Sequence, residues 1–551
     1  MVMVMVMVMV MVDEERASER IIAGRRLRWD AARAADAYAQ GWWSRDTLGA
    51  MLARSAHEAP GRVVIEDGGH RMDCAALYRD ARALASAMLE IAAPGSVISM
   101  MLPNWHEAAI VYHAATLAGM VIHPILPSMR EREIAFMLDD ARSAMVFVPG
   151  EFRGRDYAAM LRNVCEGLSD PPRIIAVRDN SSGQITFSDM LAARAFGDLP
   201  EVDPDAVRMI MYTSGTTGRP KGVMHSQNSI HALIRQLGAH WPIEPGDRFL
   251  VPSPISHIGG SIYTFEMPVM LGTSAVLMEQ WDATAGLALM RDHSVTHMAG
   301  ATPFLEQLLA AAQVAEERLP DLKLFVCGGA GVPPRLIEDA AAHFADAVVM
   351  RVYGSTEVPV ITVGTIDRRD VAHSAHTDGR AGIADVRLAS GDVQGGLEIV
   401  ARGPQMLVGY HRADDEAAAF DLDGFFRTGD LGHFVDEDYL VISGRAKDII
   451  IRNGENIAPK EIEDLLAAHP AVAEVAIVGL PDPKTGERAC AVVVPRNGQF
   501  PELAALTVFL RSAGIASFKL PERLELWDAL PKNVTGKVVK HEIRATLMAQ
   551  G

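Results

Sequence analysis

Short apolar runs alternate with longer helical patterns along the first two thirds of the chain. The strand-like runs are residues 97–102, 144–148, 174–177 and 348–352. Stretches rich in Ala and Leu, such as 75–91 and 105–118, are typical of helices. This alternation predicts parallel or mixed sheets covered by helices, and proteins of this α/β class bind ligands at the ends of their strands.

The pattern changes twice in the last third of the chain. Residues 380–442 have short strand-like runs separated by Gly-rich turns, which predicts a β subdomain. After Gly444 a compact α+β unit is expected, with helices at 459–468, 503–511 and 540–548 and strands at 472–478 and 489–494. The predicted organisation is a large N-terminal domain of residues 31–445, which contains the β subdomain, and a small C-terminal domain of residues 446–551.

The first 12 residues are six Met-Val pairs followed by Asp13-Glu14-Glu15. The tract is short and has no basic segment before it, which argues against a signal peptide or a spanning helix. Its alternating valines leave a stray strand and a disordered tail both open. We assign the Met-Val tract no function, take residues 1–30 as an N-terminal tail that contains it, and expect no stable membrane insertion.

Composition and charge restrict the partners of the chain. Its 551 residues exceed one ordinary core, and 49% hydrophobic with 22% charged residues is an ordinary globular composition. A net charge of −18 disfavours nucleic acid and anionic membranes as general partners, so any nucleotide must be held by local donors. Four cysteines without CxxC spacing indicate neither a zinc site nor a disulfide framework, which fits a cytoplasmic protein.

A run of ten residues rich in hydroxyls and glycine follows the apolar stretch 207–212. It reads TSGTTGRPKG at 213–222 and ends with a single lysine, Lys221, before Gly222. Glycines let backbone N–H groups approach phosphate oxygens, and hydroxyls and a lysine add donors and charge. A Walker A loop starting at Gly215 would need Gly at position 220 and Ser or Thr at 222, where this chain has Pro220 and Gly222. The run predicts a phosphate cradle of another kind, with a plain surface turn as the alternative.

Six further motifs follow this loop in a fixed order. They are VCGGA at 326–330, YGSTE at 353–357, TGD at 428–430, GRAKD at 444–448, NGENIAP at 453–459 and PKNVTGK at 531–537. Together with the loop they resemble the acyl-adenylate-forming superfamily, which includes acyl-CoA synthetases, the adenylation domains of peptide synthetases, and luciferases. The resemblance covers most of the chain and implies a mobile C-terminal domain with its hinge at Lys447.

The resemblance implies a reaction in two steps. The carboxylate of an acid attacks the α-phosphate of ATP, which gives an acyl-adenylate and pyrophosphate. Because two anions meet in this step, catalysis depends on positioning and on positive charge at the phosphate. Lys537, carried on a loop after a Thr-Gly turn, is expected to supply that charge, with Lys221 in support; a solvated surface lysine is the alternative for Lys537.

The resemblance also assigns roles to the other motif residues. Glu357 is the expected ligand of Mg²⁺, which prefers carboxylates, phosphate oxygens and water, although a helix-start glutamate is the alternative. Tyr353 offers a flat face to adenine or is simply a buried aromatic, while Asp430 and Arg445 bind the ribose. The remaining expected contacts with ATP and CoA are Thr213, Ser214, Gly215, Thr216, Thr217, Gly218, Gly329, Ala330, Gly354, Ser355, Thr356, Lys447 and Gly454, among which Thr216 is counted as catalytic.

His257 lies in PISHIGG at 254–260, the His257 motif, which resembles the family's motif at the junction of the nucleotide and acyl sites. The resemblance implies that His257 donates to the substrate carboxylate or acts as a gate; a structural histidine is the alternative. Five apolar residues after it have helical spacing and are candidates for either an acyl pocket or the core: Ile258, Ile262, Tyr263, Phe265 and Met267. Domains that select α-amino acids usually have an aspartate just after this motif, and none stands between Ile258 and Phe265. The predicted substrate is therefore an apolar acid without an α-amino group, either fatty, cyclic or derived from a terpenoid or steroid.

In the second step a thiolate attacks the acyl carbonyl. The resemblance implies that the C-terminal domain rotates, withdraws Lys537 and brings the loop of Gly454 to the cleft, where glycine allows close approach of a pantetheine arm or forms a plain turn. No carrier domain follows the last predicted helix, which favours coenzyme A as the acceptor. A stand-alone enzyme that loads a carrier protein is the alternative, and a homodimer is left open.

Overall fold

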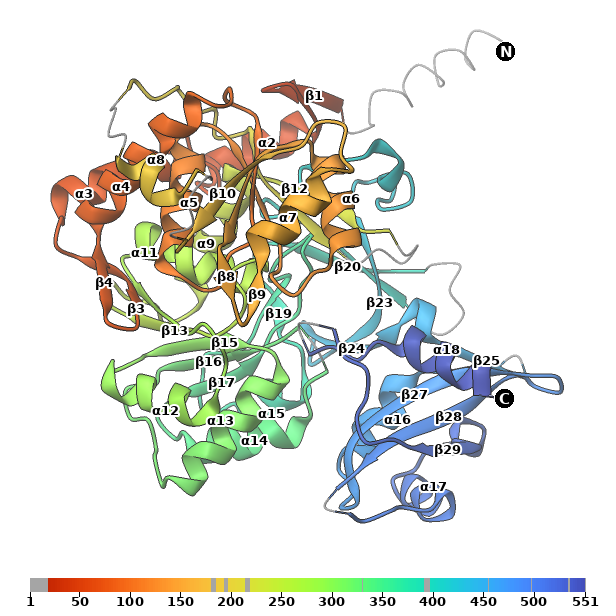
Figure 1. Ribbon diagram of the computed structural model, residues 1–551. Coiled ribbons are helices and arrows are strands. Elements are labelled where there is room, and N and C mark those ends of the chain that lie inside the picture. The colour runs from red at the N-terminus through yellow and green to blue at the C-terminus, as the bar shows by residue number, and fades with distance from the viewer. Residues whose placement is uncertain are drawn as a thin grey trace, which may run out of the picture.

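The computed structural model describes residues 18–179, 185–192, 197–213, 219–329, 331–390, 397–453, 455–496, 498–533 and 536–550. Within these residues the strands form two seven-stranded sheets, a six-stranded sheet, a five-stranded sheet and two short hairpins. The first three sheets make up a large body, and the fourth belongs to a smaller unit drawn in blue in Figure 1. The α/β class expected from the sequence is confirmed.

The first seven-stranded sheet has the order β10-β7-β5-β6-β11-β12-β22 and is parallel from β10 to β11. In chain order its strands are β5 (Val97–Met100), β6 (Val121–Pro124), β7 (Ser143–Pro149), β10 (Arg173–Val177), β11 (Val207–Thr213), β12 (Lys221–Ser226) and β22 (Gly409–Tyr410). Its helices are α4 (Cys74–Leu89), α5 (His106–Leu117), α6 (Glu131–Ala141), α7 (Tyr157–Cys165), α8 (Phe187–Ala192) and α9 (Gln227–His240).

Helices cover both faces of this sheet because its strands are apolar on both sides. Along β7, Met145 and Phe147 belong to one core together with residues of α4 and α5. The alternate residues Val146 and Val148 belong to a second core with residues of α6 and α7. A strand that buries both sets of side chains is typical of a parallel sheet between helical layers.

The second seven-stranded sheet has the order β17-β16-β15-β13-β14-β3-β4, and all pairs except β3 with β4 are parallel. Its strands are β3 (Val63–Asp67), β4 (His70–Asp73), β13 (Arg248–Val251), β14 (Ser274–Leu277), β15 (His297–Gly300), β16 (Leu324–Cys327) and β17 (Val348–Arg351). Its helices include α3 (Leu48–Glu58), α12 (Ala283–Asp292), α13 (Thr302–Val314), α14 (Pro334–His343) and α15 (Val371–His376).

The two large sheets share one core, and a continuous helical segment lies in it. The segment consists of α10 (Ile258–Ser261), the π-helix η1 (Ile262–Glu266) and α11 (Met267–Met270). Tyr263 stacks on Phe249 of β13 with ring centroids 5.1 Å apart, and Phe265 stacks on Tyr112 of α5 at 4.3 Å. The segment therefore joins a strand of the second sheet to a helix of the first.

The carboxyl ends of the two sheets are also held together directly. The side-chain amide of Asn104, in the loop after β5, donates to the carbonyl oxygens of Val251 at 3.0 Å and Met278 at 3.2 Å. These carbonyls stand at the ends of β13 and β14, so a buried amide of the first sheet satisfies backbone acceptors of the second. The strand ends at which the sequence predicts ligands thus belong to one region.

A six-stranded antiparallel sheet connects the large body to the C-terminal unit. In the order found in the sheet, its strands are β18 (Thr362–Val363), β19 (Arg380–Ala381), β24 (Tyr439–Arg445), β23 (Phe426–Val435), β21 (Leu397–Arg402) and β20 (Asp385–Ala389). It includes the predicted β subdomain, but starts earlier in the chain than residue 380, because β18 returns to pair with β19.

The C-terminal unit is a five-stranded sheet with three helices. Its elements are β25 (Ile450–Arg452), β26 (Glu455–Ile457), α16 (Pro459–Leu466), β27 (Val472–Asp482), β28 (Gly486–Pro495), α17 (Leu503–Ser512), β29 (Arg523–Leu526) and α18 (Lys540–Gln550). Strands β27 and β28 are longer than predicted because they pair from Val472 with Pro495 to Asp482 with Gly486, as one continuous hairpin.

The predicted N-terminal tail is too long. Residues expected to belong to it form the hairpin β1 (Ser18–Ile22) and β2 (Arg25–Trp29), and α2 (Ala31–Ala39) follows. Leu27 is only 1% exposed, and the backbone N–H of Arg28 donates to Val408 at 2.8 Å. Burial of a leucine and pairing of a backbone amide hold this segment on the body. The Met-Val tract lies outside the described residues, and no helix among the described ones is long and apolar enough to cross a membrane.

Candidate active site

The hydroxyl-rich loop is the turn of a hairpin. Strand β11 ends at Thr213, which pairs with Lys221 at the start of antiparallel β12. A Walker A loop joins a strand to a helix, so the mismatch at Pro220 and Gly222 corresponds to a different backbone topology. The predicted phosphate ligands Ser214, Gly215, Thr216, Thr217 and Gly218 lie outside the described residues.

Lys221 and Glu357 belong to two separate motifs, and both lie close to Tyr410. The Tyr410 hydroxyl donates to Glu357 Oε1 at 3.1 Å, and Lys221 Nζ lies 5.3 Å from the centre of the tyrosine ring. The backbone carbonyl of Glu357 accepts from Leu407 N–H at 2.7 Å. The half-buried Glu357 is thus fixed by hydrogen bonds to its carboxylate and to its backbone carbonyl, and a carboxylate is a ligand type that Mg²⁺ prefers.

Tyr353, Asp430 and Arg445 form a second group. The Tyr353 hydroxyl donates to Asp430 Oδ2 at 2.7 Å, and Arg445 Nε lies 2.8 Å from Oδ1 of the same carboxylate. Asp430 and Arg445 are paired opposite each other in β23 and β24. Burial raises the pKa of Tyr353 well above its usual range, and the charge of Asp430 raises it further, so the phenol keeps its proton and donates.

The YGSTE turn accepts only glycine at its second position. A Cβ on Gly354 would lie 2.4 Å from the backbone nitrogen of Val360. Ser355 closes the turn, because its N–H donates to the Val358 carbonyl at 3.1 Å and its hydroxyl accepts from Val358 N–H at 3.2 Å. Val360 has φ of +46°, which is rare for a β-branched residue and is typical of strained segments at functional sites.

His225 holds this turn and was missed from the sequence. Its Nε2 lies 2.7 Å from the carbonyl oxygen of Thr356, and its Nδ1 lies 3.1 Å from Ser229 Oγ. Burial lowers the pKa of His225 to about 4, so the ring is neutral and donates one N–H to Thr356. Because side chains alternate along β12, Lys221 and His225 are on the same face of the strand. This two-residue period is the sequence signal from which His225 could have been predicted near the site.

Gly329, in the VCGGA motif, has the backbone conformation that favours glycine. Its φ is +81°, it is exposed, and no atom lies within 4 Å of a Cβ built on it. The preceding Gly328 is confined, since a Cβ there would lie 2.9 Å from the Val352 carbonyl oxygen. A flat ligand can therefore approach the backbone after β16 closely. Ala330 lies outside the described residues.

His257 precedes α10 and is also neutral. Burial lowers its pKa to about 4, and its buried Nε2 has no hydrogen-bond partner among the described residues. Of the five apolar candidates after it, Ile262, Tyr263, Phe265 and Met267 are at most 6% exposed and belong to the core, whereas Ile258 is half-buried. The core interpretation therefore fits four of the five in this ligand-free chain.

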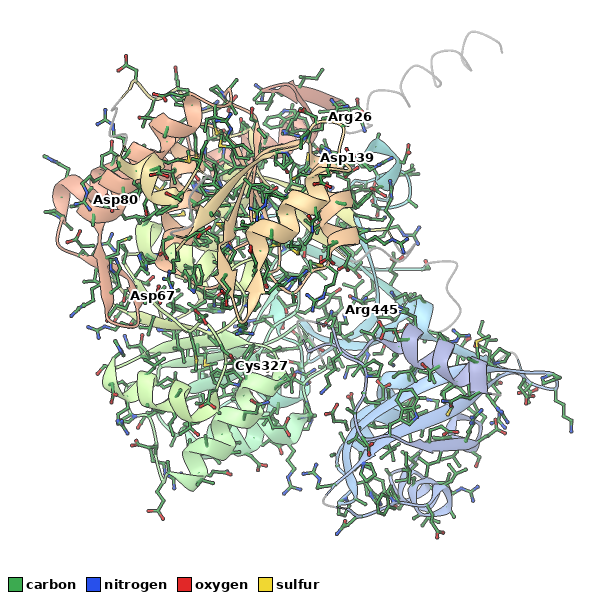
Figure 2. The ribbon with its side chains drawn as sticks, in the orientation of Figure 1. Arg26, Asp67, Asp80, Asp139, Cys327 and Arg445 are labelled. Carbon is green, nitrogen blue, oxygen red and sulfur yellow. The ribbon has the colours of Figure 1, made fainter. Side chains whose placement is uncertain are left out.

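Lys537, in the C-terminal unit, is close enough to Asp430 and Arg445 for their charges to act on its amine. The pKa of its amine is lowered to about 8, mainly by burial and also by the charges of Arg445 and Lys447, while the charge of Asp430 opposes the shift. The loop that carries Lys537 contacts the large body, because a Cβ on Gly536 would lie 3.4 Å from Pro303 Cγ at the start of α13. Figure 2 shows Arg445 where the large body meets the blue C-terminal unit.

Lys447 is exposed and lies in the short 3₁₀ turn Ala446–Asp448. This turn connects β24 of the six-stranded sheet to β25 of the C-terminal sheet. It is thus located where the chain passes from one unit to the other. The other predicted residue of this unit, Gly454, lies outside the described residues.

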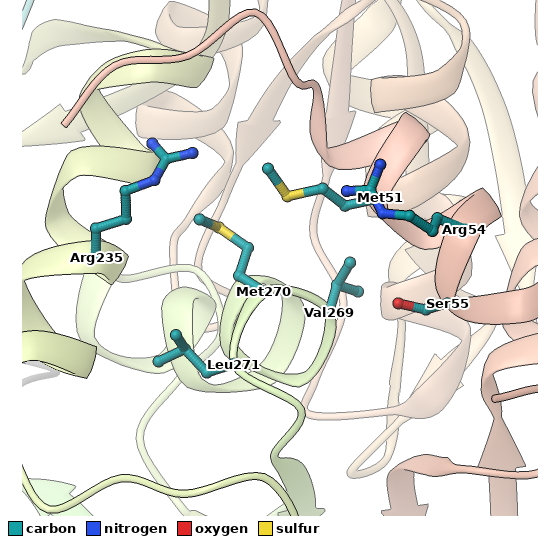
Figure 3. Close-up of a pocket in the computed structure, with 7 residues that line it drawn as sticks. All are labelled: Met51, Arg54, Ser55, Arg235, Val269, Met270 and Leu271. Carbon is teal, nitrogen blue, oxygen red and sulfur yellow. The ribbon is translucent and has the colours of Figure 1, made fainter. Parts of the chain in front are cut away.

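Two other features are separate from these motifs. A cavity of about 300 Å³ is lined by Met51, Arg54, Ser55, Arg235, Val269, Met270 and Leu271, none of which belongs to a motif (Figure 3). Metal-ligating atoms of Asp67, His106 and Glu107 lie within 4.8 Å of one another. Arg178 pairs with both carboxylates, at 2.9 Å to Asp67 and 2.7 Å to Glu107, so its charge accounts for this cluster.

Two family models match most of the chain. The family model described as AMP-binding enzyme matches residues 52–411, and that of the AMP-binding enzyme C-terminal domain matches 461–537. The chain belongs to the AMP-binding enzyme family. The expected acyl-CoA synthetase of the acyl-adenylate-forming superfamily is thereby confirmed.

Similar proteins cover nearly the whole chain. A medium-chain fatty-acid–CoA ligase of Escherichia coli is 30% identical over 92% of both chains. The long-chain-fatty-acid–CoA ligase FadD13 of Mycobacterium tuberculosis is 33% identical, over 85% of this chain and 92% of its own. The ATP-bound structure of MatB from Rhodopseudomonas palustris has a TM-score of 0.81 at 26% identity, with 91% of this chain and 99% of that chain covered.

We predict that Lys537 of this AMP-binding enzyme titrates near pH 8. Below that pH it is an ammonium ion, and above it the free amine reacts with acetic anhydride, so the labelling rate measured by peptide mass spectrometry should reach half its maximum near pH 8. Arg445→Gln removes a positive neighbour and should move the midpoint to higher pH. Labelling of the unsubstituted protein that begins only near pH 10 would contradict the burial of this amine.

Proposed function

We propose that the protein converts an apolar carboxylic acid to its acyl-adenylate with ATP and then transfers the acyl group to coenzyme A. The observation that supports the proposal is the Tyr353–Asp430–Arg445 group of the large body, in which the charges of Asp430 and Arg445 act on Lys537 of the C-terminal unit. A mobile cation at the nucleotide group suits a reaction in which a carboxylate must approach a phosphate.

The residues divide the binding of ATP between them. Asp430 and Arg445 bind the ribose, Tyr353 and the backbone of Gly329 flank adenine, and the hairpin loop with Lys221 binds the phosphates. Glu357, oriented by the Tyr410 hydroxyl, would hold Mg²⁺, which neutralises charge on the phosphates when bound. Lys537 then stabilises the negative charge that accumulates at the α-phosphate during attack.

His257 is proposed to orient the acid. Its ring is neutral at physiological pH and its buried Nε2 has a free hydrogen-bonding position, so it can donate to one oxygen of the substrate carboxylate. The other oxygen is then left to attack the phosphate. A neutral donor is suitable here because it does not stabilise the carboxylate as strongly as a charged one would.

The proposed substrate class is a fatty, cyclic, or terpenoid- or steroid-derived acid. The first acidic residue after the His257 motif is Glu266, which is fully buried and paired with Arg208 at 2.6 Å. It therefore has no charge to spare for an α-ammonium group. The names of several relatives, for medium-chain and long-chain fatty acids and for a dioxo-octahydroindenyl propanoate, agree with an apolar acyl group.

Loading of a separate carrier protein is the alternative function. The chain is also similar to triostin synthetase I. The acceptor is tested by measuring pyrophosphate release across a panel of fatty, cyclic, terpenoid, aryl and amino acids, with and without CoA. We expect release with apolar acids, faster turnover with CoA, and an acyl-CoA product. Adenylate formation without any transfer to CoA would favour a carrier protein, and no release with any acid would contradict the proposal. Cytoplasmic location and a homodimer stay predictions.

Lys537→Ala should reduce adenylate formation by about 10²- to 10³-fold, because the phosphate loses its mobile cation. Thioester formation from supplied acyl-adenylate should stay within about twofold, since the phosphate bond is already made. Pyrophosphate release and CoA acylation measure the two steps separately. Lys532→Ala is the matched control, because Lys532 pairs with Glu474 within its own unit at 2.7 Å. Equal losses in both steps would contradict the assignment.

Lys447→Pro should slow one half-reaction far more than the other, because proline restricts the backbone at the proposed hinge. Lys447→Ala removes the same exposed side chain without restricting the backbone and serves as the control. The two half-reactions are again followed by pyrophosphate release and by thioester formation. An unchanged overall rate in the proline variant would remove the hinge assignment.

A further inference from the structure

A buried ion pair lies beneath the helical segment that begins after His257. Arg208 NH2 lies 2.6 Å from Glu266 Oε1, and the two side chains are 3% and 0% exposed. Taking both charges out of water is expensive, and apolar residues of similar size often give equal or greater stability at such positions. Stability alone is therefore a weak reason for this pair.

The neighbours of the pair preserve its charge and its geometry. The Tyr112 hydroxyl donates to Glu266 Oε1 at 2.5 Å, and the Arg208 guanidinium lies 5.6 Å from the centre of the Tyr112 ring. His231 Nε2 lies 3.9 Å from Glu266 Oε2, but burial, with the charge of Arg208, keeps the pKa of His231 well below its usual range, so this ring is neutral. Among the described neighbours the carboxylate thus has one cationic partner, Arg208.

The two residues belong to elements that lead to different halves of the site. Arg208 is near the start of β11, which continues to Thr213 and the phosphate loop, five residues away or about 16 Å at the rise of a strand. Glu266 ends η1, and His257 stands just before this helical segment, nine residues away or about 14 Å at the rise of a helix. The pair therefore links the start of β11, which leads to the phosphate loop, to the helical segment that begins after His257.

The wide turn of η1 provides the contact. Met267 N–H bonds to the Ile262 carbonyl five residues back, and all five residues of η1 are buried. Single π-helical turns are frequent at functional sites. Here the turn places Phe265 against Tyr112 and the carboxylate of Glu266 against β11, in the region where α5, α9 and α11 lie together in Figure 1.

We propose that the Arg208–Glu266 pair is a positioning brace, which sets the separation between the phosphate loop and His257 and thereby the approach of the acid to the α-phosphate. The brace rests on the proposed function. Neither residue touches substrate; they act through β11 and through the helical segment. A displacement of about 1 Å far from the reacting atoms can cost about a hundredfold in rate, so such a brace has a large effect without contact.

The test uses the full-length Arg208→Met/Glu266→Leu double variant, in which apolar side chains replace the pair. We expect a thermal midpoint close to that of the unsubstituted protein, because such exchanges are often neutral. ATP alone and decanoate alone should bind within about twofold. The joined analogue 5′-O-(N-decanoylsulfamoyl)adenosine should bind at least about tenfold more weakly, because only a linked ligand requires the correct separation.

Kinetics give a second readout that a merely structural role would not produce. Pyrophosphate release from ATP and decanoate should fall at least about tenfold in the double variant, whereas thioester formation at saturating decanoyl-adenylate should stay within about twofold. Glu266→Gln keeps an acceptor for Tyr112 and Arg208, and should recover part of the lost rate. Lys519→Met/Glu461→Leu removes a 2.6 Å ion pair within the C-terminal unit and is the matched control.

Several results would overturn the brace. One is a folded double variant with unchanged analogue binding and pyrophosphate release, and another is an equal loss in both half-reactions. Failure of the unsubstituted protein to release pyrophosphate with any acid of the panel would instead contradict the proposed function, and the brace with it.

Discussion

The carboxylate of Asp430 is the point on which the arrangement of the site depends. One oxygen accepts from the phenol of Tyr353 and the other pairs with Arg445. The charge of Asp430 also raises the pKa of the Lys537 amine, which belongs to the C-terminal unit. These four residues come from three distant parts of the chain. A buried anion of this kind is stable only with its donors present, so the nucleotide motif, the antiparallel sheet and the last loop are held to one geometry.

The charges of the site contrast with those of the whole molecule. The chain carries a net charge of −18, yet Lys221, Arg445, Lys447 and Lys537 belong to its nucleotide motifs. Burial lowers the pKa of Lys537, the neighbouring cations Arg445 and Lys447 lower it as well, and Asp430 offsets only part of the effect. Bound phosphate would supply further negative charge beside these cations, although the chain as a whole is acidic.

Packing and hydrogen bonds hold the large-body residues of the site in place. The phosphate loop is the turn of a hairpin, so both of its ends are fixed by strand pairing, and His225 on β12 ties the same hairpin to the turn after Tyr353. On the other side of the site, the helical segment after His257 is held between stacked aromatic rings of both large sheets. Rigid elements therefore support the large-body residues, while Lys537 belongs to the C-terminal unit.

Sequence alone determined the class of fold, the order of the motifs and the residues expected at the nucleotide site, because the glycines, hydroxyls and lysines that bind phosphate stand in short local runs. It also located the three α-helices of the C-terminal unit and the strands β27 and β28, where local periodicity is strong, but not β25, β26 or β29. It could not reveal that residues 18–29 form a hairpin, that His225 binds Thr356, or that Glu266 pairs with Arg208. Arg208 and Glu266 are 58 positions apart, and His225 and Thr356 are 131 positions apart. The hairpin is held by the distant backbone carbonyl of Val408, which accepts from Arg28 N–H. Only the tertiary structure decided these contacts, because a local pattern records which face of an element is apolar but not which distant residue will meet it.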